Sequence, residues 1–239
     1  MIILAVFVAA AVLPAAVLMR YIYKMDTIEK EPPELLRKLV IFGALIGIPA
    51  GFLNTLGSDL LSRFFSPDSL AYKILLPFLI VGIVEEGLKF LVLKRCTWND
   101  PAFNYRFDGV VYAAFVSLGF AALENVMYVF NYGLGIAINR AITAVPAHLG
   151  FSVIMGSYYG RAKACTFQRD PNAVKDNLRK AYLSAVLLHG FYDCCAMVGT
   201  VFTLTLFVVF VIFMYWYISR RIKKEAAMDA SIDTWYVEE

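Results

Sequence analysis

The chain contains little charge. Charged residues occupy 17% of its 239 positions and hydrophobic residues 60%, whereas soluble domains average about 25% and 45–50%. This shortage excludes an ordinary soluble domain and predicts a polytopic membrane protein. The chain also lacks a basic cluster interleaved with aromatic residues, so nucleic acid is not expected as a partner. The expected surroundings are a lipid bilayer.

Cysteine and histidine are scarce as well. None of the four cysteines has the CxxC spacing that is typical of zinc ribbons and redox pairs, so neither is expected. The two histidines, His148 and His189, both lie in apolar segments, where a random scatter would seldom place them. An internal repeat, a low-complexity tract and a second soluble domain are also lacking. We therefore expect one membrane domain over residues 1–239.

Seven apolar segments are long enough to cross a bilayer, which requires about 20 helical residues. They cover residues 2–22, 38–58, 72–93, 108–131, 137–160, 180–198 and 200–219. The first lacks a preceding basic residue and exceeds a signal-peptide core, so we expect it to be retained. A turn near Val198–Thr200 would make the last two a hairpin. We expect an all-α, polytopic transmembrane helical bundle of about seven spans, with its catalytic core in residues 72–198.

Basic residues separate the two sides of this predicted bundle. With seven spans, eighteen of the 22 Lys and Arg residues fall on one side and three on the other, and Lys89 lies within a span. Loops rich in Lys and Arg stay in the cytosol. The pattern predicts an N-terminus outside and a cytosolic C-terminus.

Ionisable residues inside the predicted spans require an explanation. An acidic side chain near the bilayer centre costs roughly 3 kcal/mol on insertion scales, a cost that Leu or Ala would avoid. The spans nevertheless contain seven such groups on four segments: Glu85, Glu86, Lys89, Glu124, His148, His189 and Asp193. Because intramembrane ionisable residues normally face the bundle interior, we expect these side chains to share one hydrated cavity.

Spacing within the spans suggests the chemistry of this cavity. Glu85 and Lys89 are four residues apart and can pair on one helix face, whereas Glu86 points about 100° away from Glu85. His189 and Asp193 have the same spacing, by which a helix offers two ligands to zinc, as in HExxH. Two imidazoles with one or two carboxylates form a reasonable zinc set, and a further carboxylate can act as the base for a metal-bound water.

Each of these groups also has a structural interpretation. Glu86 can be a salt-bridge partner of Lys89 or of a loop arginine, and the Lys89 side chain can extend to the membrane interface. Asp193 can orient His189 without binding a metal. Asn125 can form an interhelical hydrogen bond or donate to a carbonyl oxyanion. A lone intramembrane histidine often does no more than connect two helices, but a joint set on four segments favours a functional site.

Four motifs resemble those of the PrsW intramembrane proteases. They are Glu85–Lys89 (EEGLK), Phe120–Asn125 (FAALEN), His148 within PAHLG, and His189–Asp193 (HGFYD). Together they are specific, and the likeness covers about residues 72–193. The resemblance implies a protease of the bacterial plasma membrane that cuts a single-span, membrane-anchored anti-sigma factor at its outer side.

The same motifs are more distantly similar to those of the type II CAAX prenyl endopeptidases and the bacterial Abi proteins. The pair Glu85-Glu86 matches their first motif, but Lys89 replaces the expected arginine. Glu124 and Asp193 stand where that pattern has His and Asn. Both exchanges introduce a carboxylate, which favours metal binding and argues against a prenylated substrate.

We therefore predict an intramembrane endopeptidase in which Glu85 activates a water, Glu86 assists or is structural, and Asn125 steadies the oxyanion. The predicted cofactor is zinc, with the ligands Glu124, His148, His189 and Asp193. A metal-free alternative keeps Glu85 as the base and uses the histidines as oxyanion donors. A second hypothesis is an ion- or proton-coupled transporter, but this sequence lacks the inverted repeats that such transporters usually have. A third hypothesis is a scaffold that binds a partner's transmembrane helix.

Overall fold

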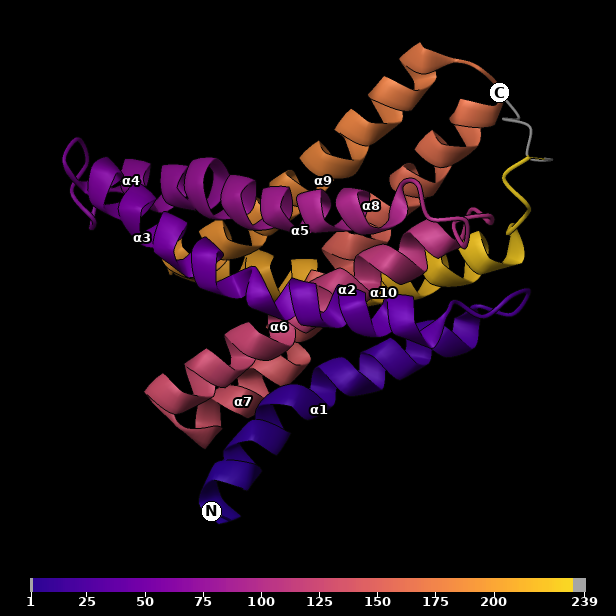
Figure 1. Cartoon of the computed structure of the whole chain (residues 1–239). Helices are drawn as coiled ribbons and strands as arrows, with labels where there is room; N and C mark the ends of the chain where they lie inside the picture. The colour runs from indigo at the N-terminus through magenta and orange to yellow at the C-terminus, as the bar shows by residue number, and fades with distance from the viewer. Residues whose placement is uncertain (1, 234–239) are drawn as a thin grey trace.

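A computed structural model describes residues 2–233 of the chain as a bundle of long helices (Figure 1). Apart from an isolated bridge between Tyr105 and Ser231, these residues form no β-structure. The elements are α1 (Ile2–Met25), α2 (Pro33–Leu45), α3 (Gly47–Ser62), α4 (Leu70–Leu75), the π-helical η1 (Leu76–Val81), α5 (Gly82–Thr97), α6 (Asp108–Tyr132), α7 (Leu134–Ile142), α8 (Ala144–Phe167), α9 (Pro171–Val198) and α10 (Val201–Ala227). The predicted all-α fold is confirmed. Positions 1 and 234–239 of the predicted domain lie outside the described residues.

Six helical segments within residues 2–233 are long and apolar enough to cross a membrane. They cover Leu4–Met25, Pro33–Ser62, Asp108–Tyr132, Leu134–Phe167, Pro171–Val198 and Val201–Ala227. These correspond to six of the seven predicted spans. The remaining one, predicted at 72–93, forms the continuous run α4–η1–α5, which contains Glu85, Glu86 and Lys89. The count of seven and the orientation stay predictions.

Two of the predicted spans are broken, and the run α4–η1–α5 changes its helix type without a break. Helix α2 ends and α3 begins around Ile46, and α7 and α8 are divided at Thr143. Pro49 and Pro146 occupy the first turn of the helix that follows each break, where a backbone N–H has no intrahelical partner. The π-helical η1 contains Pro77 and ends directly before α5. Such turns are rare and often lie at functional sites.

The two ends of the bundle differ in their loops (Figure 1). The basic end, at the right of the figure, contains the loops after α1, α5 and α8 and the segment after α10. The opposite end contains the loops after α3, α6 and α9. The last of these is the predicted turn near Val198–Thr200, where Gly199 has a φ of 68°, a left-handed conformation that favours glycine. The predicted orientation places the basic end in the cytosol.

Close helix contacts hold the centre of the bundle together. A methyl group on Gly109 of α6 would lie 2.7 Å from the carbonyl oxygen of Gly156 on α8, so these two backbones approach closely through small residues. A Cβ on Gly82 of α5 would lie 3.0 Å from the carbonyl oxygen of Val186 on α9. Because α8 also packs along α9, four helices meet, and they contain all the predicted site residues.

Candidate active site

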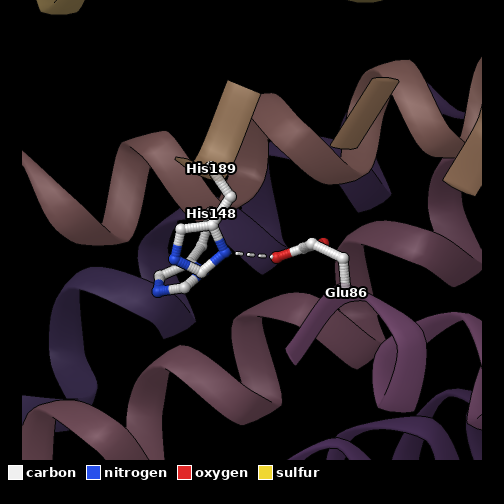
Figure 2. A group of neighbouring side chains, drawn as sticks. All are labelled: Glu86, His148 and His189. Atoms are coloured by element: carbon white, nitrogen blue, oxygen red, sulfur yellow. Dashed lines mark hydrogen bonds and ion pairs between the residues drawn. The ribbon is translucent and has the colours of Figure 1, made fainter. Parts of the chain in front are cut away.

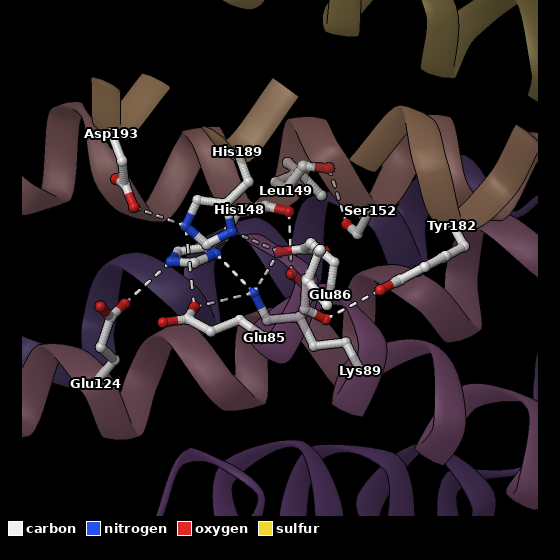
Figure 3. Close-up of polar contacts among 12 residues, drawn as sticks. Glu85, Glu86, Lys89, Glu124, His148, Leu149, Ser152, Tyr182, His189 and Asp193 are labelled. Carbon is white, nitrogen blue, oxygen red and sulfur yellow. Dashed lines mark hydrogen bonds and ion pairs between the residues drawn. The ribbon is translucent and has the colours of Figure 1, made fainter. Parts of the chain in front are cut away.

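A cavity of about 680 Å³ lies among α3, α5, α6, α7, α8, α9 and α10. Its polar lining includes Glu85, Glu124, His148, His189 and Asp193. These side chains point toward one another from four helices (Figure 3). The structure therefore brings together in one cavity five of the residues that the sequence analysis singled out.

Glu86 lies behind this lining and is completely buried. Its Oε1 accepts hydrogen bonds from Lys89 Nζ at 2.7 Å and from His189 Nδ1 at 2.8 Å. Its Oε2 is buried and has no hydrogen-bond partner. An unsatisfied buried carboxylate oxygen is costly, so this oxygen is available to a further ligand.

Lys89 connects Glu86 to the first histidine. Its Nζ lies 3.1 Å from His148 Nδ1, and the residue is only 1% exposed, so the side chain does not extend to the membrane interface. An ammonium group can only donate, so His148 Nδ1 is the acceptor and Nε2 carries the proton. His148 Nε2 then donates to Glu124 Oε2 at 3.0 Å. The network thus sets the tautomer of His148.

His189 is arranged in the same way as His148. Its Nδ1 faces Glu86, and its Nε2 lies 3.3 Å from Asp193 Oδ2. The ring stacks on Phe151 with a centroid distance of 5.1 Å and lies 5.3 Å from the ring of His148. Each imidazole therefore directs Nδ1 toward the Glu86–Lys89 pair and Nε2 toward an acidic residue.

Glu85 is a buried acid of this set that is held by one hydrogen bond and keeps a second carboxylate oxygen without one. Asn54 on α3 donates from Nδ2 to Glu85 Oε1 at 3.0 Å. Glu85 Oε2 is buried without a hydrogen-bond partner, 3.7 Å from Lys89 Nζ and 3.9 Å from His189 Nε2. Asn54 was not among the predicted site residues, because an asparagine in an apolar segment gives no sign of its partner.

Arg140 is a second site residue that the sequence analysis missed. Its Nη2 donates to Glu124 Oε2 at 2.7 Å, its Nε donates to Asn125 Oδ1 at 2.7 Å, and its guanidinium lies 3.9 Å from the centroid of the Tyr128 ring. From the sequence, Arg140 was counted only as one of the three basic residues on the outer side. It is the one Lys or Arg between Arg106 and Arg161, and this isolation was the available signal.

Asn125 uses both ends of its amide between helices. Besides accepting from Arg140, it donates from Nδ2 to the carbonyl oxygen of Ala11 on α1 at 2.9 Å, and it is completely buried. It is not part of the cavity lining. These contacts match the interhelical alternative, and the oxyanion role of Asn125 stays a prediction.

Glu86, His148 and His189 fit a metal ion (Figure 2). Each offers one donor atom, and the three atoms lie within 4.8 Å of one another. Two imidazoles and one carboxylate form a common catalytic zinc set, and acids on the far ring nitrogens orient such ligands. The unpartnered Glu86 Oε2 agrees with this fit. This group of possible metal ligands contains both histidines of the predicted zinc site. Its acidic member is Glu86, whereas the predicted acidic ligands were Glu124 and Asp193.

Comparisons with known proteins agree with these motifs. The family model described as PrsW family intramembrane metalloprotease matches residues 31–218. Protease PrsW of Oceanobacillus iheyensis is 36% identical over 198 residues, which cover 83% of this chain and 86% of that protein. Protease PrsW of Clostridioides difficile is 32% identical, and the match covers 86% of this chain and 85% of that protein. Protease PrsW of Bacillus subtilis is 30% identical, and the match covers 93% of this chain and 96% of that protein. No solved structure matches the chain.

Proposed function

The chain belongs to the PrsW family of intramembrane proteases of bacterial membranes, and we propose that it cleaves a single-span anti-sigma factor with a water that Glu85 activates, aided by zinc. The observation that carries this proposal is the position of Glu85 Oε2. This oxygen is buried without a hydrogen-bond partner, on a residue that lines the cavity beside His148 and His189. Membership of the family selects a peptidase, acting on membrane-embedded substrates, over the transporter and scaffold hypotheses.

Glu85 acts as the general base in this proposal. Asn54 holds Oε1, which leaves Oε2 to take a proton from a water in the cavity as that water attacks the substrate carbonyl carbon. The same carboxyl group then returns the proton to the amine that leaves when the peptide bond breaks. General acid–base catalysis of this kind contributes about 10²- to 10⁴-fold to a rate.

His148, His189 and Glu86 would hold the zinc ion. When bound, zinc polarises the substrate carbonyl and favours deprotonation of water. Glu124 and Asp193, which the sequence analysis proposed as ligands, instead hold the far nitrogens of the two imidazoles. Arg140 in turn compensates the charge of Glu124. The assignment keeps both predicted histidines and gives Glu86 a ligand role.

The remaining cavity lining suits an extended segment of a membrane protein. Helix α10 contributes Leu204 and Phe207, and α3 contributes Gly51, where an added Cβ would meet no atom within 4 Å. Asn139 and Met197 continue the lining toward the opposite end. In the predicted orientation this end faces outward, so the proposed cut lies near the outer surface.

The metal-free alternative is a second candidate, because one contact favours it. The ammonium of Lys89 lies between Glu86 and His148, at 2.7 Å and 3.1 Å, and so already supplies a positive charge inside the donor set. In this version Glu85 remains the base. The two candidates differ in whether cleavage requires a metal.

The test is cleavage of a tagged single-span anti-sigma factor by the purified full-length chain in lipid. We expect one cut, which mass spectrometry of the products places near the outer surface. Strong chelation should abolish cleavage, and added zinc should restore it. Uncleaved substrate in every condition would overturn the substrate assignment, whereas full activity of a chelated protein without metal would overturn only the zinc assignment.

A further inference from the structure

Lys89 occupies the centre of the donor set that fits a metal. Its Nζ contacts Glu86 Oε1 and His148 Nδ1 and lies 4.1 Å from the centroid of the Phe120 ring. The residue is 1% exposed, so no solvent separates the ammonium from these groups. One cation therefore already uses two of the three side chains that would bind a second cation.

We propose that the Lys89 ammonium and a divalent metal ion compete for His148 Nδ1 and for the space beside the Glu86 carboxylate. Metal then binds only when the ammonium leaves His148 Nδ1, and the ammonium blocks the site while it stays. This inference rests on the proposed ligand set of Glu86, His148 and His189. It adds an internal competitor, contributed by the chain itself, which decides whether the site is open to metal.

Charge and hydrogen bonding make the two occupants mutually exclusive. An ammonium has three donors and no lone pair, so it cannot join a coordination shell. Two positive charges a few ångströms apart in a poorly hydrated site also repel strongly. The lone pair of His148 Nδ1 points either at Lys89 Nζ or at a metal, and it cannot serve both.

The structure also offers the displaced ammonium another acceptor. Glu85 Oε2 lies 3.7 Å from Lys89 Nζ, is buried and has no hydrogen-bond partner. Glu85 and Glu86 lie four and three residues before Lys89 on α5, so a rearrangement of one side chain moves the ammonium from one acid to the other. Such a move would free His148 Nδ1 for metal.

The test measures zinc affinity of the full-length chain in lipid after the protein is stripped of metal. Lys89→Met removes the ammonium and keeps an apolar chain of similar length. Lys94→Met is the matched control, because Lys94 is exposed on the same helix. We expect Lys89→Met to bind zinc about tenfold more tightly or better, the size of a lost charge-assisted hydrogen bond, and Lys94→Met to match the wild type. Equal or weaker binding by a folded Lys89→Met would overturn the competition.

A second measurement uses the wild type, in case Lys89→Met does not fold. With ¹⁵N-labelled lysine side chains, the Nζ signal of Lys89 is identified as the one missing in Lys89→Arg. Saturating zinc should shift that signal, and a signal that stays unmoved at saturation would overturn the proposal. Both experiments measure metal binding and neither measures cleavage. The outcome of the substrate assay that tests the proposed peptidase activity is therefore independent of them.

Discussion

Two groups of buried ionisable side chains in the described bundle differ in what surrounds them. At the basic end, Glu225 pairs with Arg106 at 2.6 Å, Arg221 at 2.8 Å and Arg161 at 3.8 Å, and we call this set the Glu225 network. None of its members lines the cavity that contains Glu85. The network joins the start of α6, the end of α8 and the end of α10.

The cavity set differs from this network in the pairing of its carboxylate oxygens. Glu85 and Glu86 each keep one buried oxygen without a hydrogen bond, whereas both carboxylate oxygens of Glu225 face arginines. Burial and charge are therefore shared by both groups. The adjoining cavity together with the two unpaired carboxylate oxygens is what supports the cavity set as the proposed active site.

The sharpest test of this contrast is Glu85→Gln. Glutamine keeps the oxygen that accepts from Asn54 but cannot act as a base, so we expect at least a 10²-fold loss of cleavage with little change in thermal stability. Cleavage rate and melting temperature should be measured together. Glu34→Gln, the same change at an exposed position of α2, is the control. Wild-type cleavage by Glu85→Gln would contradict the assignment of the base.

Glu225→Ala should have the converse effect. It leaves three arginines around an empty position, and removal of one partner from a buried ion pair typically costs about 3–5 kcal/mol. We expect a large fall in melting temperature and yield, while the cleavage rate per folded molecule stays near that of the wild type. An unchanged melting temperature would show that the network contributes little to stability.

Asp193→Asn should give a smaller effect on the cavity set. The change removes the charge that faces His189 Nε2, and loss of such an outer carboxylate typically lowers metal affinity or activity about 10- to 100-fold. Zinc titration and cleavage assays would measure it, with the exposed Asp59→Asn as the control. A loss as complete as that of a ligand variant such as His189→Ala would instead support the predicted direct role of Asp193.

The smallest expected effect concerns pH at the basic end, in the loop between α1 and α2. Burial raises the pKa of Glu31 from its ordinary 4.5 to about 7, although the Tyr112 hydroxyl donates to it. The folded protein therefore binds more protons here than the unfolded chain, so stability should fall as pH rises from about 4.5 through 7. Melting temperatures across this range should flatten in Glu31→Gln. An equally steep profile in the variant would exclude Glu31 as the source.

Much of the site was predictable because intramembrane charge is so costly. That cost alone singled out Glu85, Glu86, Glu124, both histidines and Asp193, and the structure places them around one point. Counted along straight, ideal spans at about 1.5 Å per residue, Glu124 would lie about 6 Å deeper than His148. The broken and packed helices instead put these two side chains 3.0 Å apart.

The partners of these residues were not predictable in the same way. Asn54 and Arg140 act across helix interfaces, and a single sequence does not say which face of α3 or α7 meets the cavity. The division of acids between base, ligand and orienting partner also depends on which imidazole nitrogen each one faces. Helical spacing predicts which face of a helix a residue lies on, but it does not predict which way an imidazole ring is turned.

The π-helical turn before α5 sets the rotational phase of the two glutamates. A π-turn accommodates about one residue more than an α-turn, which rotates everything after it by roughly 100° about the helix axis. Deleting a single residue within Leu76–Val81 would therefore be expected to aim Glu85 and Glu86 at lipid or at the wrong neighbour, with no change in any side chain of the site. The chemistry of this protein thus depends on the length of a segment that carries no polar group.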